Sequence, residues 1–399
     1  MKILVVCQYY YPEPFRITDI CEELVKEGHD VTVLTGIPNY PMGRIYEGYR
    51  HGEKRNEVIN GVHVHRCFTV GRRHGAIWRF INYYSFAISS SMYVNQLSSD
   101  FDVVLVNQLS PVMMANAGIK YKQKYHKKLV LYCLDLWPES LVAGGIKRNS
   151  PVYKLFHRIS AKVYRSADKL LVTSRMFADY FKREFDIQDN VLEYLPQYAE
   201  DNFLLPTESD PLVEKAKETV DLMFAGNIGA VQSVETIIRA ANELKNQPQI
   251  RFHVLGDGSE LENCKRLAET LGLRSVIFYG RKPIDEMPQY YAMADAMLVT
   301  MQDDPVLALT LPGKIQTYMA AGKAIIGAAS GETQAVINEA KCGICVNAED
   351  YIGLADVIKE FSESDNRQDF GKCARFFYHQ NFEKSAFMEQ LSRVLSKAK

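Results

Sequence analysis

Short apolar runs, each ending in polar residues or glycine, recur along the chain and are separated by stretches with helical periodicity. In the first half they lie at 3–7, 31–36, 103–108, 129–135 and 170–174. Such runs predict buried parallel strands, because a sheet covered by helices on both sides has no polar face. Between the first two runs, apolar residues from Ile17 to Val25 form one helical stripe, and Gly28 can end that helix. The pattern predicts an α/β fold built from βαβ units.

A second series of such runs follows a polar, proline-bearing stretch at 199–218. It lies at 222–226, 252–256, 276–280, 296–300, 324–329 and 343–346. The chain, at 399 residues, also exceeds one usual core. We expect two doubly wound, Rossmann-like domains at 1–198 and 219–377, joined by the linker 199–218, with a cleft at the carboxyl ends of both sheets. The last stretch, 378–399, is helical and could cross back to the first domain.

Charge and cysteine content narrow the class of protein. The 47 basic and 48 acidic residues give no bulk charge for nucleic-acid binding. The apolar run near the N-terminus is too short for a signal-peptide core, and no later segment reaches the ~20 apolar residues of a membrane-spanning helix. We therefore expect a cytoplasmic protein with reduced thiols. The pair Cys342 and Cys345 has redox or zinc spacing but lacks a second pair, so such a role stays an alternative.

Two helix starts in the second half could bind an anion. A predicted strand ends at Gly226, the turn Asn227 to Gly229 follows, and a helix begins near Ser233. This geometry can cradle phosphate with backbone amides, although an ordinary tight turn would need the same glycines. The stretch fits neither the dinucleotide fingerprint nor the P-loop.

The second helix start is LPGKIQTYMAAGKAI, residues 311–325. Pro312 and Gly313 open it, and Lys314 places its ammonium near the positive end of the helix dipole. Such a cation costs about 0.5 kcal/mol unless a bound anion offsets it. The alternative is a solvated surface lysine. Two such helix starts suggest a diphosphate.

These motifs carry a resemblance to a known family. They are AGNIG with Gln232, the stretch 311–325, GE at 331–332 and EAKCG at 339–343, together with QYYYPEPFR at 8–16, GHDVTVLTGIPNYP at 28–41 and DLWPES at 135–140. The chain resembles the family 4 glycosyltransferases, retaining enzymes of the GT-B fold. Within them it is similar to the bacterial capsule and O-antigen subgroup that moves N-acetyl-L-fucosamine or a related amino sugar onto a lipid-linked sugar. The resemblance implies a UDP-sugar donor, a polyprenyl-diphosphate-linked sugar acceptor, and no cofactor or metal.

The resemblance also implies donor-site residues, with one departure. The family's two glutamates eight positions apart are replaced here by Leu309 and Thr317, which leaves ribose recognition to Thr317. The family's arginine and lysine pair is also absent, so that Lys314 and the backbone amides would have to neutralise more of the phosphate charge. The expected donor-binding set is Gly226, Asn227, Gly229, Gln232, Gly256, Arg281, Pro312, Gly313, Thr317 and Glu332, with Lys314 stabilising the leaving diphosphate.

Polar residues after two strands of the first half suit an acceptor sugar. Asp135, Trp137 and Glu139 follow the run at 129–135, and Glu13 and Arg16 follow the first run. Asp135 or Glu139 could orient the acceptor or act as base, with Arg16 beside them. Helix capping is the alternative for Glu13 and Asp135, and a core position is the alternative for Trp137.

A basic and aromatic segment at 72–93 suits an anionic membrane surface. Arg72, Arg73, Trp78 and Arg79 would contact lipid headgroups, which implies a peripheral protein on the inner face of the plasma membrane. Packing against the first sheet is the alternative.

Two groups of side chains could be taken for metal ligands. Asp100 and Asp102 form the one D-x-D, but they precede their strand and so lie at the end of the sheet away from the expected cleft. His63 and His65 share a face of a strand without a carboxylate partner.

Two other functions stay open from the sequence. A nucleotide-sugar 2-epimerase uses the same paired halves without an acceptor, and a non-catalytic sugar-nucleotide-binding subunit would fit the missing glutamates.

Overall fold

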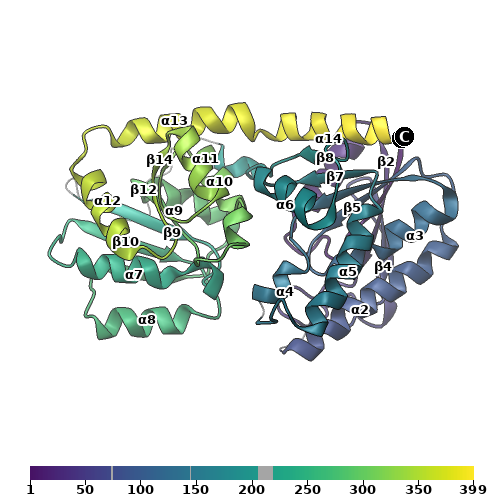
Figure 1. The fold of residues 1–399 in the computed structure, drawn as a ribbon, viewed down its shortest axis with the longest axis horizontal. Coiled ribbons are helices and arrows are strands. Elements are labelled where there is room, and N and C mark those ends of the chain that lie inside the picture. Colours follow the sequence, from purple (N-terminus) through teal and green to yellow (C-terminus); the bar gives the residue numbers. More distant parts are fainter. Residues whose placement is uncertain (73–74, 144, 205–218) are drawn as a thin grey trace. The chain divides into compact units, whose positions relative to one another are not determined.

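The chain folds into two compact units. The computed structural model describes residues 1–72, 75–143, 145–204 and 219–399 (Figure 1). One unit comprises Met1–Leu195 and Met388–Lys399, and the other comprises Pro196–Phe387. Residues 205–218 of the expected linker lie outside the described residues.

The first unit contains an eight-stranded sheet in the order β3-β4-β2-β1-β5-β6-β7-β8. Neighbouring strands are parallel except for β3 and β4. Each run predicted in this half is one of these strands. The strands are β1 (Lys2–Val6), β2 (Asp30–Gly36), β3 (Asn56–Ile59), β4 (Val62–Cys67), β5 (Val103–Gln108), β6 (Lys128–Cys133), β7 (Lys169–Val172) and β8 (Leu192–Tyr194).

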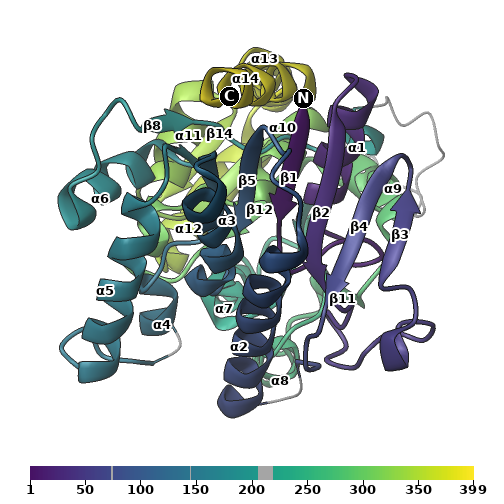
Figure 2. The ribbon, with the colours of Figure 1, turned by 90° about the vertical axis from the view of Figure 1, so that its right-hand side faces the viewer.

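Helices cover this sheet. Figure 2 shows α2 and α3 in front of the strands and α1 behind them. The helices are α1 (Ile17–Lys26), α2 (Ala76–Tyr93), α3 (Asn116–Tyr125), α4 (Glu139–Ala143), α5 (Pro151–Arg165) and α6 (Arg175–Phe185). The predicted stripe is confirmed in α1, where Ile17, Ile20, Cys21 and Leu24 are buried.

The C-terminal helix α14 (Lys384–Ala398) reaches the first unit. The side chain of Gln390 donates to the carbonyl of Tyr194 at 2.8 Å, and Lys399 lies 3.4 Å from the carboxylate of Asp102.

The second unit contains a six-stranded parallel sheet in the order β11-β10-β9-β12-β13-β14. The strands are β9 (Val220–Ala225), β10 (Ile250–Leu255), β11 (Val276–Gly280), β12 (Ala296–Thr300), β13 (Ala324–Ala328) and β14 (Gly343–Val346). The helices are α7 (Val234–Glu243), α8 (Leu261–Thr270), α9 (Met287–Met293), α10 (Gly313–Ala320), α11 (Glu332–Ala340), α12 (Tyr351–Glu363) and α13 (Arg367–Asn381).

Both faces of this second sheet are buried, which explains its continuous apolar runs. Leu222 and Phe224 of β9 pack in a core with α7, α8 and α12. Met223 and Ala225 pack in the opposite core with α9, α10, α11 and α13. The result is an α/β/α sandwich, and the predicted α/β fold class is confirmed.

A search of the described residues for a helix long and apolar enough to span a membrane finds none.

Candidate functional site

The glycine turn after β9 is packed against the loop after β10. The amide of Gly226 donates to the carbonyl of Leu255 at 3.0 Å, and the amide of Ile228 donates to that of Asp257 at 2.9 Å. A Cβ atom on Gly256 would lie 1.8 Å from the carbonyl oxygen of Gly226. Gly256 therefore allows two loops to pack backbone to backbone, a role that the sequence analysis assigned to ligand contact.

The side chain of Gln232 closes the same turn. Its Oε1 atom accepts from the Asn227 side chain at 3.0 Å and from the Gly229 amide at 3.3 Å. The backbone amides of Gly226, Ile228 and Gly229 therefore donate hydrogen bonds to other groups of the protein. The expectation that the amides of 226–229 face a phosphate is corrected, because three of the four already have partners in the neighbouring loop or in Gln232. Asn227 is exposed.

Helix α10 begins beside this turn. Pro312 is its N-cap residue, one position earlier than the first-turn place expected for it, and Gly313 and Lys314 are its first two residues. The hydroxyl of Tyr318, one turn later, accepts from the amide of Ala225 at 3.2 Å and donates to its carbonyl at 3.0 Å. These two bonds fix the start of α10 against the carboxyl end of β9.

The ammonium of Lys314 lies buried at this junction. Its Nζ atom is 4.0 Å from the centre of the Phe224 ring and would be 3.1 Å from a Cβ atom on Gly226. The side chain as a whole is partly exposed, yet Nζ is shielded from solvent and has no hydrogen-bond partner among the described residues. Burial lowers the pKa of Lys314 to about 7. A desolvated cation without a partner is unfavourable, and a bound anion would relieve that cost.

The other donor-site residues divide by exposure. Arg281 is exposed directly after β11. Thr317 is buried, and its hydroxyl donates to the carbonyl of Gly313 at 3.2 Å. The expectation that Thr317 contacts a ribose is corrected, because its hydroxyl bonds back into its own helix. Glu332 is also buried, at the first position of α11.

In the first unit, Glu13 holds two loops together. Its Oε1 atom accepts from the amides of Asn39 at 2.8 Å and Tyr40 at 2.7 Å, and Oε2 accepts from that of Tyr10 at 3.4 Å. The side chain is buried, and burial raises the pKa of Glu13 to about 7 despite these amide donors. The expected direct contact with an acceptor is corrected to a positioning role.

Glu139 is likewise an internal side chain. Its carboxylate accepts from Arg148 at 2.8 Å, from the Tyr153 hydroxyl at 2.9 Å and from the Tyr180 hydroxyl at 3.0 Å. It is 3% exposed, so the expectation that Glu139 acts as base or orients the acceptor is corrected.

Asp135 and Trp137 face a cavity of about 520 Å³ in the first unit. The Oδ1 atom of Asp135 accepts from Ser140 at 2.6 Å, and Oδ2 accepts from the hydroxyl of Ser110. Burial raises the pKa of Asp135. The Trp137 indole donates to the Ser110 hydroxyl at 2.7 Å. Arg16 is a half-buried residue at the start of α1 and does not line this cavity.

Aromatic side chains form a large part of the cavity wall. Its lining residues are Tyr9, Phe15, Tyr40, Arg72, Arg79, Phe80, Tyr83, Leu109, Ser110, Leu134, Asp135, Trp137, Ser140, Leu141 and Ile146. Of its aromatic residues, Trp137 was predicted for an acceptor site. Tyr9, Phe15 and Tyr40 lie in the motifs quoted at 8–16 and 28–41, and Phe80 and Tyr83 lie in the segment 72–93 that was expected to contact the membrane. The membrane contact expected of Arg72 is corrected, because its side chain lines this cavity. Arg73 lies outside the described residues.

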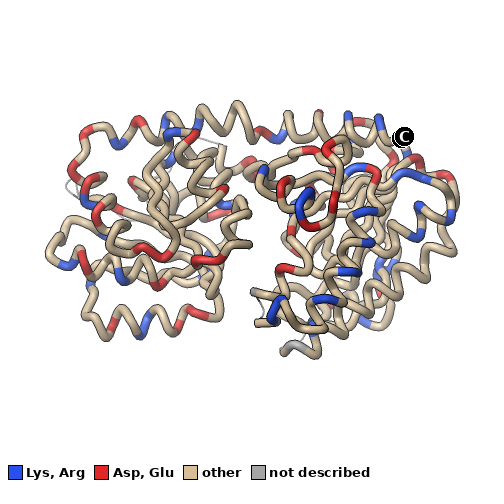
Figure 3. Tube along the Cα trace, viewed as in Figure 1, with Lys and Arg blue, Asp and Glu red and all other residues tan. Residues whose placement is uncertain are grey.

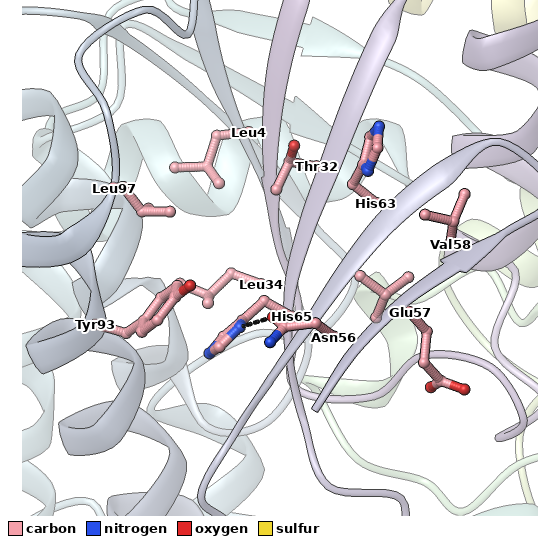
Figure 4. Close-up of a pocket in the computed structure, with 11 residues that line it drawn as sticks. Leu4, Thr32, Leu34, Asn56, Glu57, Val58, His63, His65, Tyr93 and Leu97 are labelled. Carbon is pink, nitrogen blue, oxygen red and sulfur yellow. Dashed lines mark hydrogen bonds between the residues drawn. The ribbon is translucent and has the colours of Figure 1, made fainter. Parts of the chain in front are cut away.

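A second hollow, of about 290 Å³, lies beside β4 in the same unit. Figure 4 shows His63 and His65 on its wall. The Nδ1 atom of His65 donates to the side-chain oxygen of Asn56 at 2.6 Å, and its ring stacks on Tyr93 with ring centres 3.5 Å apart. These contacts explain His65 without a metal.

The remaining metal and redox candidates are structural. Among the described residues, no three His, Cys, Asp or Glu side chains lie close enough together to share a metal ion. Asp100 and Asp102 bond to Lys2 at the amino end of β1, as their position before β5 indicates. Cys342 and Cys345 are free thiols whose pKa values burial raises to about 12.

Comparisons with known proteins agree with this arrangement. Residues 15–197 match the family model described as a glycosyl transferase 4-like domain, and residues 207–376 match that described as glycosyl transferases group 1. WbjE of Pseudomonas aeruginosa, named a probable glycosyltransferase, is 29% identical over 274 residues, which cover 66% of this chain and 67% of WbjE. WcaI of Escherichia coli (strain K12), provisionally named a colanic acid biosynthesis glycosyl transferase, is 26% identical over 90% of this chain and 92% of its own.

Solved structures share the fold at lower identity. The crystal structure of Anabaena HepE in complex with UDP-glucose matches with a TM-score of 0.73 and 15% identity over 100% of both chains.

Proposed function

Because this chain belongs to the family 4 glycosyltransferases, which have the GT-B fold, we propose that it transfers a sugar from a UDP-sugar to a polyprenyl-diphosphate-linked saccharide. The donor would bind in the second unit and the acceptor in the first. The sugar would be an N-acetylated amino or deoxy sugar, as the sequence resemblance implies.

The burial of the Lys314 ammonium is the observation that supports the donor site most directly. This ammonium lies desolvated at the start of α10 and has no hydrogen-bond partner among the residues that the structure describes. The first amides of a helix also lack internal partners. A diphosphate would supply the missing counter-charge and accept hydrogen bonds from both groups. HepE, which shares the fold, is known in complex with UDP-glucose, and this favours UDP as the nucleotide.

The proposed reaction needs no protein nucleophile. The bond between the sugar anomeric carbon and the diphosphate oxygen breaks, and UDP leaves with the electron pair. The acceptor hydroxyl oxygen bonds to the same carbon from the face that UDP leaves, and its proton passes to a phosphate oxygen. Lys314 and the amides at the start of α10 stabilise the charge that grows on the diphosphate, a kind of contribution worth about 3 kcal/mol per well-placed donor. This charge stabilisation by the protein is the basis for proposing metal-independent transfer.

Asp135 is the polar group best placed to orient an acceptor. Its two oxygens already accept from Ser110 and Ser140, but each carboxylate oxygen can accept a further hydrogen bond. Asp135 would hold an acceptor hydroxyl in the aromatic cavity. The name of WcaI supports a role in assembly of a surface polysaccharide such as capsule or O-antigen.

The epimerase alternative is not favoured, because both curated relatives are named as glycosyltransferases. A mass-spectrometric assay with UDP-N-acetyl sugars and a lipid-linked acceptor tests the proposal. Transfer in EDTA supports it. Interconversion of donor epimers without acceptor, or UDP binding without transfer to any lipid-linked sugar, would contradict it.

Two neighbouring helices support contact with an anionic membrane on the cytoplasmic side. Helix α2 exposes an apolar stripe, and the Phe80 ring lies 6.1 Å from that of Phe156 in α5. The exposed side chains of the stripe are Ile77, Trp78, Ile81, Tyr84, Ile88 and Met92. Helix α5 contains no acidic residue, and its basic residues recur at one-turn spacing. They are Lys154, Arg158, Lys162 and Arg165. Figure 3 shows Lys and Arg recurring along α5 and α3.

Sedimentation with vesicles of mixed anionic and neutral lipid tests this surface. We expect Ile81→Glu with Ile88→Glu to release the protein, since a charge at both positions removes the apolar stripe. The matched control is Lys359→Glu at an exposed position of α12, which changes the net charge by the same two units and should leave sedimentation unaltered. Equal sedimentation of both variants would contradict membrane contact through α2.

A further inference from the structure

The aromatic cavity of the first unit contains more positive than negative charge. Arg72 and Arg79 contribute two guanidinium groups, and Asp135 contributes one carboxylate that two serine hydroxyls already engage. Arginine presents a planar set of donors that matches the oxygens of phosphate groups. The cavity volume of about 520 Å³ is within the range of small-ligand sites.

Arg72 is held in place by the residues around it. Its backbone amide donates to the side-chain oxygen of Asn39 at 3.0 Å, and its guanidinium lies 5.6 Å from the centre of the Tyr83 ring. Asn39 in turn is fixed by Glu13 and by the buried side chain of Asn82. Arg72 is therefore a preorganised cation at the cavity wall, whereas Arg79 is exposed on the first turn of α2.

Tyr9 provides a second indication of a polar ligand. Its side chain is 3% exposed and lines the cavity. Its hydroxyl oxygen interacts with the guanidinium of Arg72, which lines the same cavity. A hydroxyl that accepts from a guanidinium still has its own proton to donate, and a ligand oxygen in the cavity can accept it. The stacked rings of Tyr9 and Phe15, 4.9 Å apart, give a flat apolar surface beside it.

Resting on the proposed function, we propose that this cavity binds the glycosyl diphosphate end of the acceptor. The diphosphate lies between Arg72 and Arg79 and accepts from the Tyr9 hydroxyl. The sugar ring lies against the aromatic wall, with one hydroxyl bonded to Asp135. The apolar stripe of α2 continues from Arg79, so a lipid chain attached to the diphosphate would have an apolar surface next to it.

Tryptophan fluorescence can follow binding in this cavity directly. The chain has two tryptophans, and Trp137 lines the cavity. In a Trp78→Phe background, Trp137 is therefore the one reporter. The probes are decyl diphosphoryl N-acetylglucosamine, pyrophosphate, and decyl N-acetylglucosaminide, which lacks the diphosphate.

We expect the decyl diphosphoryl sugar to change Trp137 fluorescence and the neutral glycoside to bind at least tenfold more weakly. Arg72→Gln with Arg79→Gln should raise the Kd of the diphosphate probe at least tenfold, while Arg183→Gln, at an exposed position of α6, leaves it unchanged. Binding of pyrophosphate as well would assign recognition to the diphosphate alone. If decyl diphosphoryl N-acetylglucosamine binds and pyrophosphate does not, the cavity recognises the diphosphate as part of a lipid-linked sugar.

An unchanged Kd in the double arginine variant, or equal binding of the neutral glycoside, would overturn the inference. The thermal shift produced by UDP in the same variants separates this result from failure of the proposed function. A variant that still shows the thermal shift with UDP but no longer binds the decyl diphosphoryl sugar has lost the acceptor site alone. A wild-type protein with no UDP shift would instead point to a wrong donor assignment.

Discussion

The Nζ atom of Lys314 lies 4.0 Å from the centre of the Phe224 ring, at the junction of α10 and β9. A cation over an aromatic face gains about 0.5–2 kcal/mol, which offsets only part of the cost of removing it from water. The two Tyr318 bonds to Ala225 keep the helix start at this place. Within the part of the chain that the structure describes, this cation therefore lacks a counter-charge at the proposed diphosphate site.

Replacing Lys314 should separate ligand binding from folding. We expect Lys314→Met to lower kcat at least tenfold, because a donor to the leaving diphosphate is lost. Without nucleotide, its Tm should equal or exceed that of the wild type, since a desolvated cation is replaced by an apolar chain of similar length. Differential scanning fluorimetry and initial rates measure both. Lys359→Ala, at an exposed position of α12, is the control. A large loss of Tm in Lys314→Met would mean that the lysine is needed for the fold itself.

Nucleotide binding should take up protons near neutral pH. Burial lowers the pKa of Lys314 to about 7, and a bound diphosphate would raise it, so the complex holds more protons than the free protein between about pH 7 and 10. Affinity for UDP should therefore fall as pH rises above 7. Calorimetry at pH 7.5 in buffers of different ionisation enthalpy measures the uptake. An arginine stays protonated at all these pH values, so Lys314→Arg should abolish the part of the proton uptake that comes from residue 314. The same uptake in both proteins would exclude Lys314 as its source.

The strands of both sheets were predictable because their burial is local to the sequence. A strand covered on both faces is apolar on both of its sides, as at residues 3–6 of β1 and residues 103–106 of β5, and this pattern needs no knowledge of distant residues. β3 and β8 were missed for the opposite reason. β3 alternates partly buried and exposed residues at a sheet edge, and β8 has three residues.

The site residues were predictable only where the chain itself carries the signal. Lys314 follows a proline and a glycine at a helix start, so its position was evident. The hydrogen-bond partners of Glu13 and Glu139 come from Asn39 and Tyr180, far along the chain. When the hydrogen-bond partners of a carboxylate are remote in sequence, the residues next to it in the chain do not show whether it is bonded or free. Asp135 and Trp137 were predicted to face an acceptor, but the rest of the cavity wall was not, because it is assembled from segments up to 137 residues apart, from Tyr9 to Ile146.

The glycine at 256 should be irreplaceable. A Cβ atom there would lie 1.8 Å from the carbonyl oxygen of Gly226 and would separate the two loops. Gly256→Ala should lower Tm and weaken UDP binding together. Gly272→Ala is the matched control, because Gly272 also has a positive φ but a Cβ atom there would meet only the flexible end of Lys245, at 3.7 Å. It should cost about 1–2 kcal/mol from backbone strain alone and leave UDP affinity intact. Equal loss of UDP affinity in both variants would contradict this assignment.

The two carboxylates after β6 should behave differently when made neutral. Asp135→Asn should lower the rate of transfer at least tenfold with a small change in Tm, because Asp135 lines the cavity. Glu139→Gln should lower the free energy of unfolding by about 1–3 kcal/mol, because the partners Arg148, Tyr153 and Tyr180 lose a shared acceptor. Urea unfolding and steady-state rates at 20 °C measure the contrast. A rate loss confined to Glu139→Gln would reverse the roles given to these residues.

His65 should contribute to acid sensitivity. Burial lowers its pKa to about 4, from 6.5 in the unfolded chain, so the unfolded state binds more protons between these values. The free energy of unfolding should therefore fall as pH decreases from 6.5 to 4. His65→Gln should flatten this dependence, whereas His63→Gln, at an exposed position two residues away, should not. Parallel pH profiles for all three proteins would refute the role of His65.

The measurement that tests the central claim most directly is a thermal-shift titration of the wild-type protein with UDP, GDP and ADP in EDTA. The account predicts that UDP raises Tm in a concentration-dependent way, that GDP and ADP do so much less, and that added magnesium does not increase the shift. Absence of any shift at millimolar UDP, or a shift that appears only with magnesium, would contradict a metal-independent diphosphate site at the start of α10.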